Sequence, residues 1–80
     1  MDRLTEADAR TLRLLTGGPA HELLDRPLRS LLTPLARGWA EAGPVYEHVR
    51  PDGRRDRARS VRITEAGHQA LAAHERGREP

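Results

Sequence analysis

The sequence predicts a single α+β domain that is mostly helical, with three helices, a two-stranded hairpin and a short carboxy-terminal helix. Leucine and alanine recur at helical spacing in the first half of the chain and again near its end. Two short segments in the second half instead carry apolar residues at every second position, which is typical of strands. A chain of 80 residues can form one small core. We therefore expect one domain over residues 1–80, with its core at about 4–76.

The first predicted helix covers "LTEADARTLRLLTGG", residues 4–18. Thr5 is expected to cap it, two acidic residues follow in the first turn, and Gly17 or Gly18 ends it. Most of its leucines lie near one face, so this helix is predicted to be scaffold. A short second helix is predicted at about Ala20 to Asp25, between two prolines that suit its start and its end.

The third predicted helix covers "SLLTPLARGWAEAG", residues 30–43. Ser30 or Thr33 can cap it, and Gly43 lies where a left-handed residue would end it. Leu35 and the only tryptophan, Trp39, are expected to face the core in this register, with the tryptophan as a packing anchor.

Two strands, "PVYEHV" and "SVRIT", are predicted to follow as an antiparallel hairpin. Apolar residues stand at every second position, Val45 and Val49 in the first strand and Val61 and Ile63 in the second, and Val61 and Ile63 are expected to face the core. The intervening "RPDGRRDRAR" holds Pro-Asp-Gly, a turn signal, and forms a long basic tip. A final helix is expected from a Thr64 cap to about Arg76, closed by Gly77.

Charge is distributed unevenly along the chain. Residues 1–49 hold six arginines against seven acids, whereas residues 50–62 hold six arginines against two acids. The positive excess therefore lies in the hairpin tip. Arginine forks onto phosphate oxygens, so this segment is a candidate contact for nucleic acid; the alternative is a solvated, mobile loop.

Other classes of function have little support in the sequence. There is no cysteine, and His68 and His74 are six residues apart, so neither a metal site nor another cofactor is expected. Ser30 and Ser60 have no evident base, which argues against an enzyme. No apolar run approaches the ~20 residues that span a bilayer. We expect a cytoplasmic protein that does not contact a membrane.

The predicted order of helix, helix, helix, strand, wing, strand, helix is that of a winged helix-turn-helix. Three stretches resemble PadR-type repressors: "LRLLTGGPAHELL", "LLTPLARGWAEAGPV" and "GRRDRARSVRITEAGHQAL". The last of these is also similar to MarR-type regulators. The resemblance covers about residues 12–71. It implies a bacterial transcriptional repressor that binds duplex DNA as a homodimer, here through the first and last helices if it dimerises.

In this interpretation the third helix enters the major groove and the wing contacts the backbone or the minor groove of the DNA. The candidate DNA-binding residues are Arg29, Ser30, Thr33, Arg37, Arg50, Arg54, Arg55, Arg57 and Arg59. An alternative function is a winged-helix module that binds another protein within a larger nucleic-acid-handling assembly. The small net charge of +2 and the acidic first half keep this alternative open.

Overall fold

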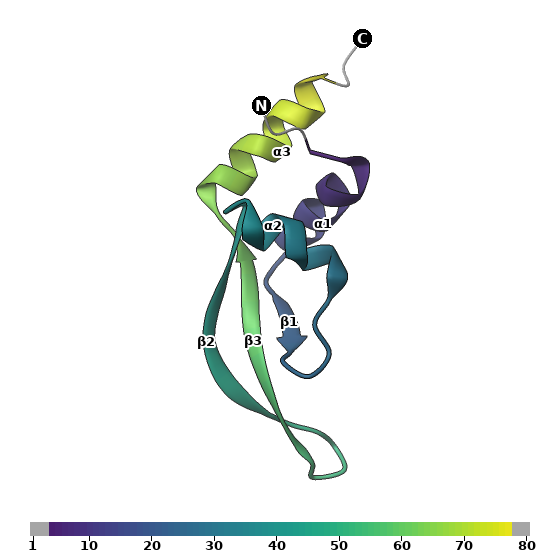
Figure 1. Ribbon diagram of the computed structural model, residues 1–80, viewed down its shortest axis with the longest axis vertical. Coiled ribbons are helices and arrows are strands. Elements are labelled where there is room, and N and C mark those ends of the chain that lie inside the picture. Colours follow the sequence, from purple (N-terminus) through teal and green to yellow (C-terminus); the bar gives the residue numbers. More distant parts are fainter. Residues whose placement is uncertain (1–3, 78–80) are drawn as a thin grey trace.

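The computed structural model describes residues 4–77. The elements, in chain order, are α1 (Glu6–Thr16), β1 (Ala20–Leu23), the 3-10 helix η1 (Arg29–Leu31), α2 (Leu32–Ala36), β2 (Ala40–Val49), β3 (Arg55–Ile63) and α3 (Glu65–Gly77). The molecule is elongated, with extents of 51 × 20 × 18 Å. The helices gather at one end, and the β2–β3 hairpin extends away from them as a long arm (Figure 1).

The three strands form one antiparallel sheet in the order β1-β3-β2. The first strand, β1, pairs with only the inner part of β3, from Ala58 to Val61, so the outer part of the arm has two strands. The register of β2 against β3 shifts between Ala42 and Val45. Pro44 lies within this bulge, where its missing N–H interrupts no regular ladder bond.

The prediction of a winged helix-turn-helix is wrong. That fold places two further helices between the first strand and the hairpin, whereas this chain has one short helical stretch there, made of η1 and α2. The two helices that a helix-turn-helix needs are not both present among residues 4–77. The fold is instead α+β, with a three-stranded sheet that carries a long two-stranded arm.

The expected second helix, Ala20 to Asp25, is in fact strand β1. Its residues pair with β3, Ala20 opposite Val61 and Leu23 opposite Ala58. The segment "AHEL" is too short to show a clear period, and pairing with a neighbouring strand outweighs its weak helical preference.

The expected third helix, residues 30–43, ends at Ala36 rather than at Gly43. Gly38 adopts a left-handed φ of 75° and closes the helix. The N–H of Trp39 donates to the carbonyl of Pro34 at 2.9 Å, and that of Gly38 to Leu35 at 3.3 Å. These two bonds form a Schellman motif. The chain then continues as β2, so the residues expected at the end of a recognition helix lie on a strand.

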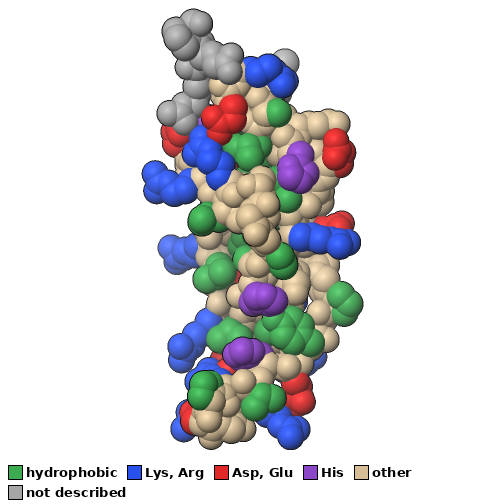
Figure 2. Space-filling view, turned by 180° about the vertical axis from the view of Figure 1, so that it is seen from behind, with side chains coloured by type: hydrophobic (Ala, Val, Ile, Leu, Met, Phe, Trp, Pro, Cys, Tyr) green, Lys and Arg blue, Asp and Glu red, His purple; other side chains and the backbone are tan. Residues whose placement is uncertain are grey.

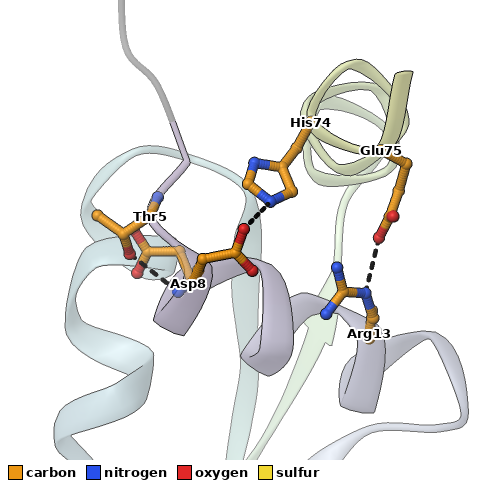
Figure 3. Close-up of polar contacts among 6 residues, drawn as sticks. Thr5, Asp8, Arg13, His74 and Glu75 are labelled. Carbon is orange, nitrogen blue, oxygen red and sulfur yellow. Dashed lines mark hydrogen bonds and ion pairs between the residues drawn. The ribbon is translucent and has the colours of Figure 1, made fainter. Parts of the chain in front are cut away.

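Both ends of the first helix and the start of the last helix are confirmed. The hydroxyl of Thr5 accepts from the N–H of Asp8 at 3.0 Å, and the Asp8 carboxylate accepts in return from the N–H of Thr5, which makes a capping box (Figure 3). Thr64 caps α3 with its hydroxyl alone, which accepts from the N–H of Gly67 at 3.1 Å. The predicted hairpin is also present, with longer strands than expected.

The core lies between the helices and the inner part of the sheet. Its buried residues include Leu12 and Leu15 of α1, Trp39, and Val61 of β3. Trp39 is 7% exposed, so the prediction that it is a packing anchor is confirmed, although it precedes a strand rather than lying on a helix. No helix among the described residues is long and apolar enough to cross a membrane.

An ion pair between Arg13 and Glu75 (Figure 3) and a contact between His74 and the carboxylate of Glu6 join α1 to α3 across the top of this core. Arg13 Nε lies 2.7 Å from Glu75 Oε1, and His74 Nε2 lies 3.3 Å from Glu6 Oε1. The first pair is well exposed, so it orients the helices more than it stabilises them.

Candidate nucleic-acid interface

The arm has two faces because side chains alternate along its strands. Arg55, Arg57 and Arg59 are two residues apart on β3 and project from one face. Their partners in the register are Val49, Glu47 and Val45 of β2. We call this side the arginine face. The two valines are 46% and 58% exposed.

Three arginines of the hairpin are held by carboxylates. Both Nε and Nη2 of Arg59 lie 2.7 Å from Oε1 of Glu22, which is 3% exposed. Arg50 forms an ion pair with Asp56, whose hydrogen bond raises the pKa of the guanidinium. Arg62 pairs with Glu41 at 2.8 Å. Of these, Arg50 and Arg59 were predicted to contact DNA, and both already have a partner within the fold.

The other three arginines, at the outer end of the arm, are exposed and only weakly paired. Arg54 Nε is 3.7 Å from Asp52, and Arg55 Nη1 is 3.6 Å from Glu47, with both guanidinium-bearing side chains more than two-thirds exposed. Arg57 is also exposed and forms no ion pair with a carboxylate of residues 4–77. Exposed pairs of this length contribute little, so these side chains can exchange their partners at small cost.

The remaining predicted residues lie on the short helical stretch between β1 and β2. Arg29 and Ser30 belong to η1, Thr33 to α2, and Arg37 is the last residue before the turn at Gly38. All four are exposed. They are not arranged along one long helix, which removes the element expected to present them to the major groove.

The opposite side of the sheet carries rings, a feature that the sequence interpretation missed. His21 Nδ1 lies 2.5 Å from the hydroxyl of Tyr46, with the two rings edge to face, and His48 follows two residues along β2. We call this side the ring face. Histidine and hydrophobic side chains gather there over the strands (Figure 2). The signal was present in the sequence, since Tyr46 and His48 alternate with the valines of the same strand.

The ring face is hollowed by a pocket of about 640 Å³. It is lined by His21, Leu23, Arg26, Tyr46, His48 and Ala58, with Arg50 and Asp56 at the outer end. No group of three or more metal-ligating side chains occurs among residues 4–77.

Comparison with known proteins adds no relative. No family model, curated protein or solved structure matches this chain. The similarity to PadR-type repressors therefore stays a prediction, and the function has to be argued from the arm itself.

Proposed function

We propose that this protein binds double-stranded DNA through the outer part of the β2–β3 arm. The observation that carries the proposal is the cluster of Arg54, Arg55 and Arg57, exposed and weakly paired at the end of an arm that stands clear of the helices (Figure 1). The long axis of 51 Å reflects this projection.

The shape of the arm suits a groove. A two-stranded ribbon fits the major groove of B-DNA, which is about 12 Å wide. Arg55 and Arg57 are two residues apart on one face of β3, so they stand about 6.8 Å apart along the strand and can contact successive phosphates of one backbone. Arg54 extends the same positive surface toward the turn.

The proposal differs from the recognition-helix mechanism in the share of the affinity that comes from contacts with the bases. Most of the affinity comes from contacts with phosphates. The exposed side chains of Val45 and Val49 are the apolar groups that can contact the base edges at the floor of the groove. If all three arginines neutralise phosphates, the logarithm of affinity should fall against the logarithm of salt concentration with a slope of about −2.7.

The first test replaces Arg54, Arg55 and Arg57 together by alanine. We expect at least about 30-fold weaker binding to a 20-base-pair duplex at 0.1 M salt, because three charge-assisted contacts to phosphate are lost. Fluorescence anisotropy of a labelled duplex measures this, with circular dichroism to confirm the fold.

The matched control replaces Arg10, Arg62 and Arg76 by alanine. These residues lie on or next to the helical half, and their replacement removes the same amount of positive charge. It should retain affinity within about threefold, since only long-range attraction is reduced. Equal weakening in both triple variants would show that net charge alone attracts DNA, and unchanged affinity in the first would contradict the role of the arm.

Exposed leucines favour a second candidate function, the binding of a protein partner. Leu14 is 74% exposed on α1 and Leu32 is 62% exposed on α2, and large exposed apolar side chains can anchor a protein partner. An interface built on these leucines would show almost no salt dependence and would be weakened by Leu14→Ser but not by the arginine variant.

A further inference from the structure

The pocket on the ring face exists because the residue at its floor is small. In the register across the sheet, Leu23 of β1, Ala58 of β3 and Tyr46 of β2 stand side by side. The two outer side chains are large and the middle one is a methyl group, 1% exposed. The result is a trough along β3 with walls from β1 and β2.

Two of the wall residues are fixed by a contact across the trough. His21 and Tyr46 lie on strands that do not pair with each other, and their 2.5 Å contact passes over β3. This contact holds the tyrosine ring in place. His48 is two residues farther along β2, so the two side chains leave the strand about 6.8 Å apart on the same face. Bases in a nucleic-acid strand stack about 3.4 Å apart, so this spacing leaves room for one planar ring between the two.

The trough offers one cationic side chain to an anion. Arg26 folds back beside Leu23 at the rim, is exposed, and has no ion pair with a carboxylate of residues 4–77. Arg50 at the outer end forms an ion pair with Asp56, and Asp25 and Asp52 also lie close enough to act on its charge. The guanidinium of Arg26 is therefore the charged group available to a ligand, and its fork geometry suits a phosphate.

We propose that this pocket binds a nucleotide, with the base between Tyr46 and His48 and the phosphate on Arg26. Aromatic rings accept any base by stacking, and an arginine at one end fixes the orientation of the phosphate. The volume of about 640 Å³ is in the usual range for small-ligand sites. The site lies on the face opposite to the arginine face, so the proposal does not depend on duplex binding. The nucleotide can be free or an unpaired residue of a strand.

The test titrates AMP, adenosine, inorganic phosphate and single-stranded (dA)8 into the full chain, followed by amide chemical shifts in two-dimensional NMR. We expect AMP to shift the amides of Ala58, Tyr46 and His48. Adenosine and phosphate alone should each bind at least about tenfold more weakly than AMP, because adenosine lacks the phosphate and inorganic phosphate lacks the base. Tighter binding of (dA)8 than of AMP would identify the occupant as an unpaired residue of a strand. Tighter binding of AMP would identify it as a free nucleotide, and either result supports the proposal.

Variants locate the site. Arg26→Ala should weaken the binding of AMP at least about tenfold and leave the binding of adenosine unchanged. His48→Ala should weaken the binding of both ligands about fivefold or more. Both positions are exposed, so the variants are expected to fold. Arg57→Ala, on the opposite face, is the matched control; it should leave AMP binding unchanged even where it weakens duplex binding. The proposal is overturned if AMP shifts no amide of the ring face, or if Arg26→Ala and Arg57→Ala affect AMP equally.

Discussion

Replacing Gly67 by alanine is expected to destabilise the domain by about 3 kcal/mol, although helix propensity alone would predict a gain of up to about 1 kcal/mol. Gly67 lies in the first turn of α3, directly against the residue before β2. A Cβ atom at this position would be 2.0 Å from the carbonyl oxygen of Trp39 and 2.7 Å from Cγ1 of Ile63. The carbonyl is backbone and already accepts from the N–H of Thr64, so it cannot move away freely.

Urea denaturation followed by circular dichroism measures this effect. Gly77→Ala is the matched control, because it makes the same change at the other end of α3, where a Cβ atom would have no neighbour within 4 Å. The control should be neutral or slightly stabilising. A domain of this size has a total stability of roughly 4–12 kcal/mol, so the loss at Gly67 removes a large share of it. An unfolding midpoint for Gly67→Ala at or above that of the wild type would contradict the packing described above.

Replacing Glu22 by alanine is expected to cost about 3 kcal/mol of stability. This carboxylate is 3% exposed and serves two partners: Oε1 accepts from Arg59, and Oε2 accepts from the N–H of Leu28 at 2.9 Å. It therefore ties β1 to β3 and to the start of η1. Its removal leaves a backbone donor and a partly buried guanidinium without their acceptor.

The matched control is Glu41→Ala, which breaks an ion pair of similar length between exposed side chains, Glu41 and Arg62. That change should cost less than about 1 kcal/mol. A more conservative variant, Glu22→Gln, keeps an acceptor oxygen, so its loss of stability should lie between those of Glu22→Ala and Glu41→Ala. The same urea experiment compares all three proteins. Equal midpoints for Glu22→Ala and Glu41→Ala would show that burial does not strengthen the Glu22 contacts.

The parts of the fold that local chemistry determines could be predicted from the sequence. The caps at Thr5 and Thr64 and the turn at Pro51-Asp52-Gly53 depend on residues within three or four positions of each other, and all three occur as expected. The buried position of Trp39 follows from its size and its apolar neighbours.

The parts that depend on distant partners were predicted wrongly. The segment around Trp39 has apolar residues that suit a helix, and two glycines could end that helix. Gly38 ends it, and the residues after it gain a strand partner in β3, which is about twenty positions away. The segment from Ala20 to Leu23 becomes a strand for the same reason.

The candidate site shows the same division. The basic character of the tip is visible in the sequence, but the sequence does not reveal which arginines are held within the fold. Arg59 is paired with Glu22, 37 positions away, whereas Arg57, two residues before it, is exposed. Tyr46 and His48 share one face of β2 by alternation alone, but the place of His21 beside them depends on the alignment of β1 with β2 across β3, which only the sheet reveals.

The bulge at Pro44 has a consequence for association between copies of the chain. β2 is a ten-residue strand at the edge of the sheet, and long, regular edge strands invite pairing with other chains and aggregation. Here the proline offers no N–H, the bulge breaks the even repeat of backbone groups, and Glu41 and Glu47 add charge on either side. A second copy therefore cannot extend the sheet along β2 in a regular way, and the arm can remain exposed without seeding an intermolecular sheet.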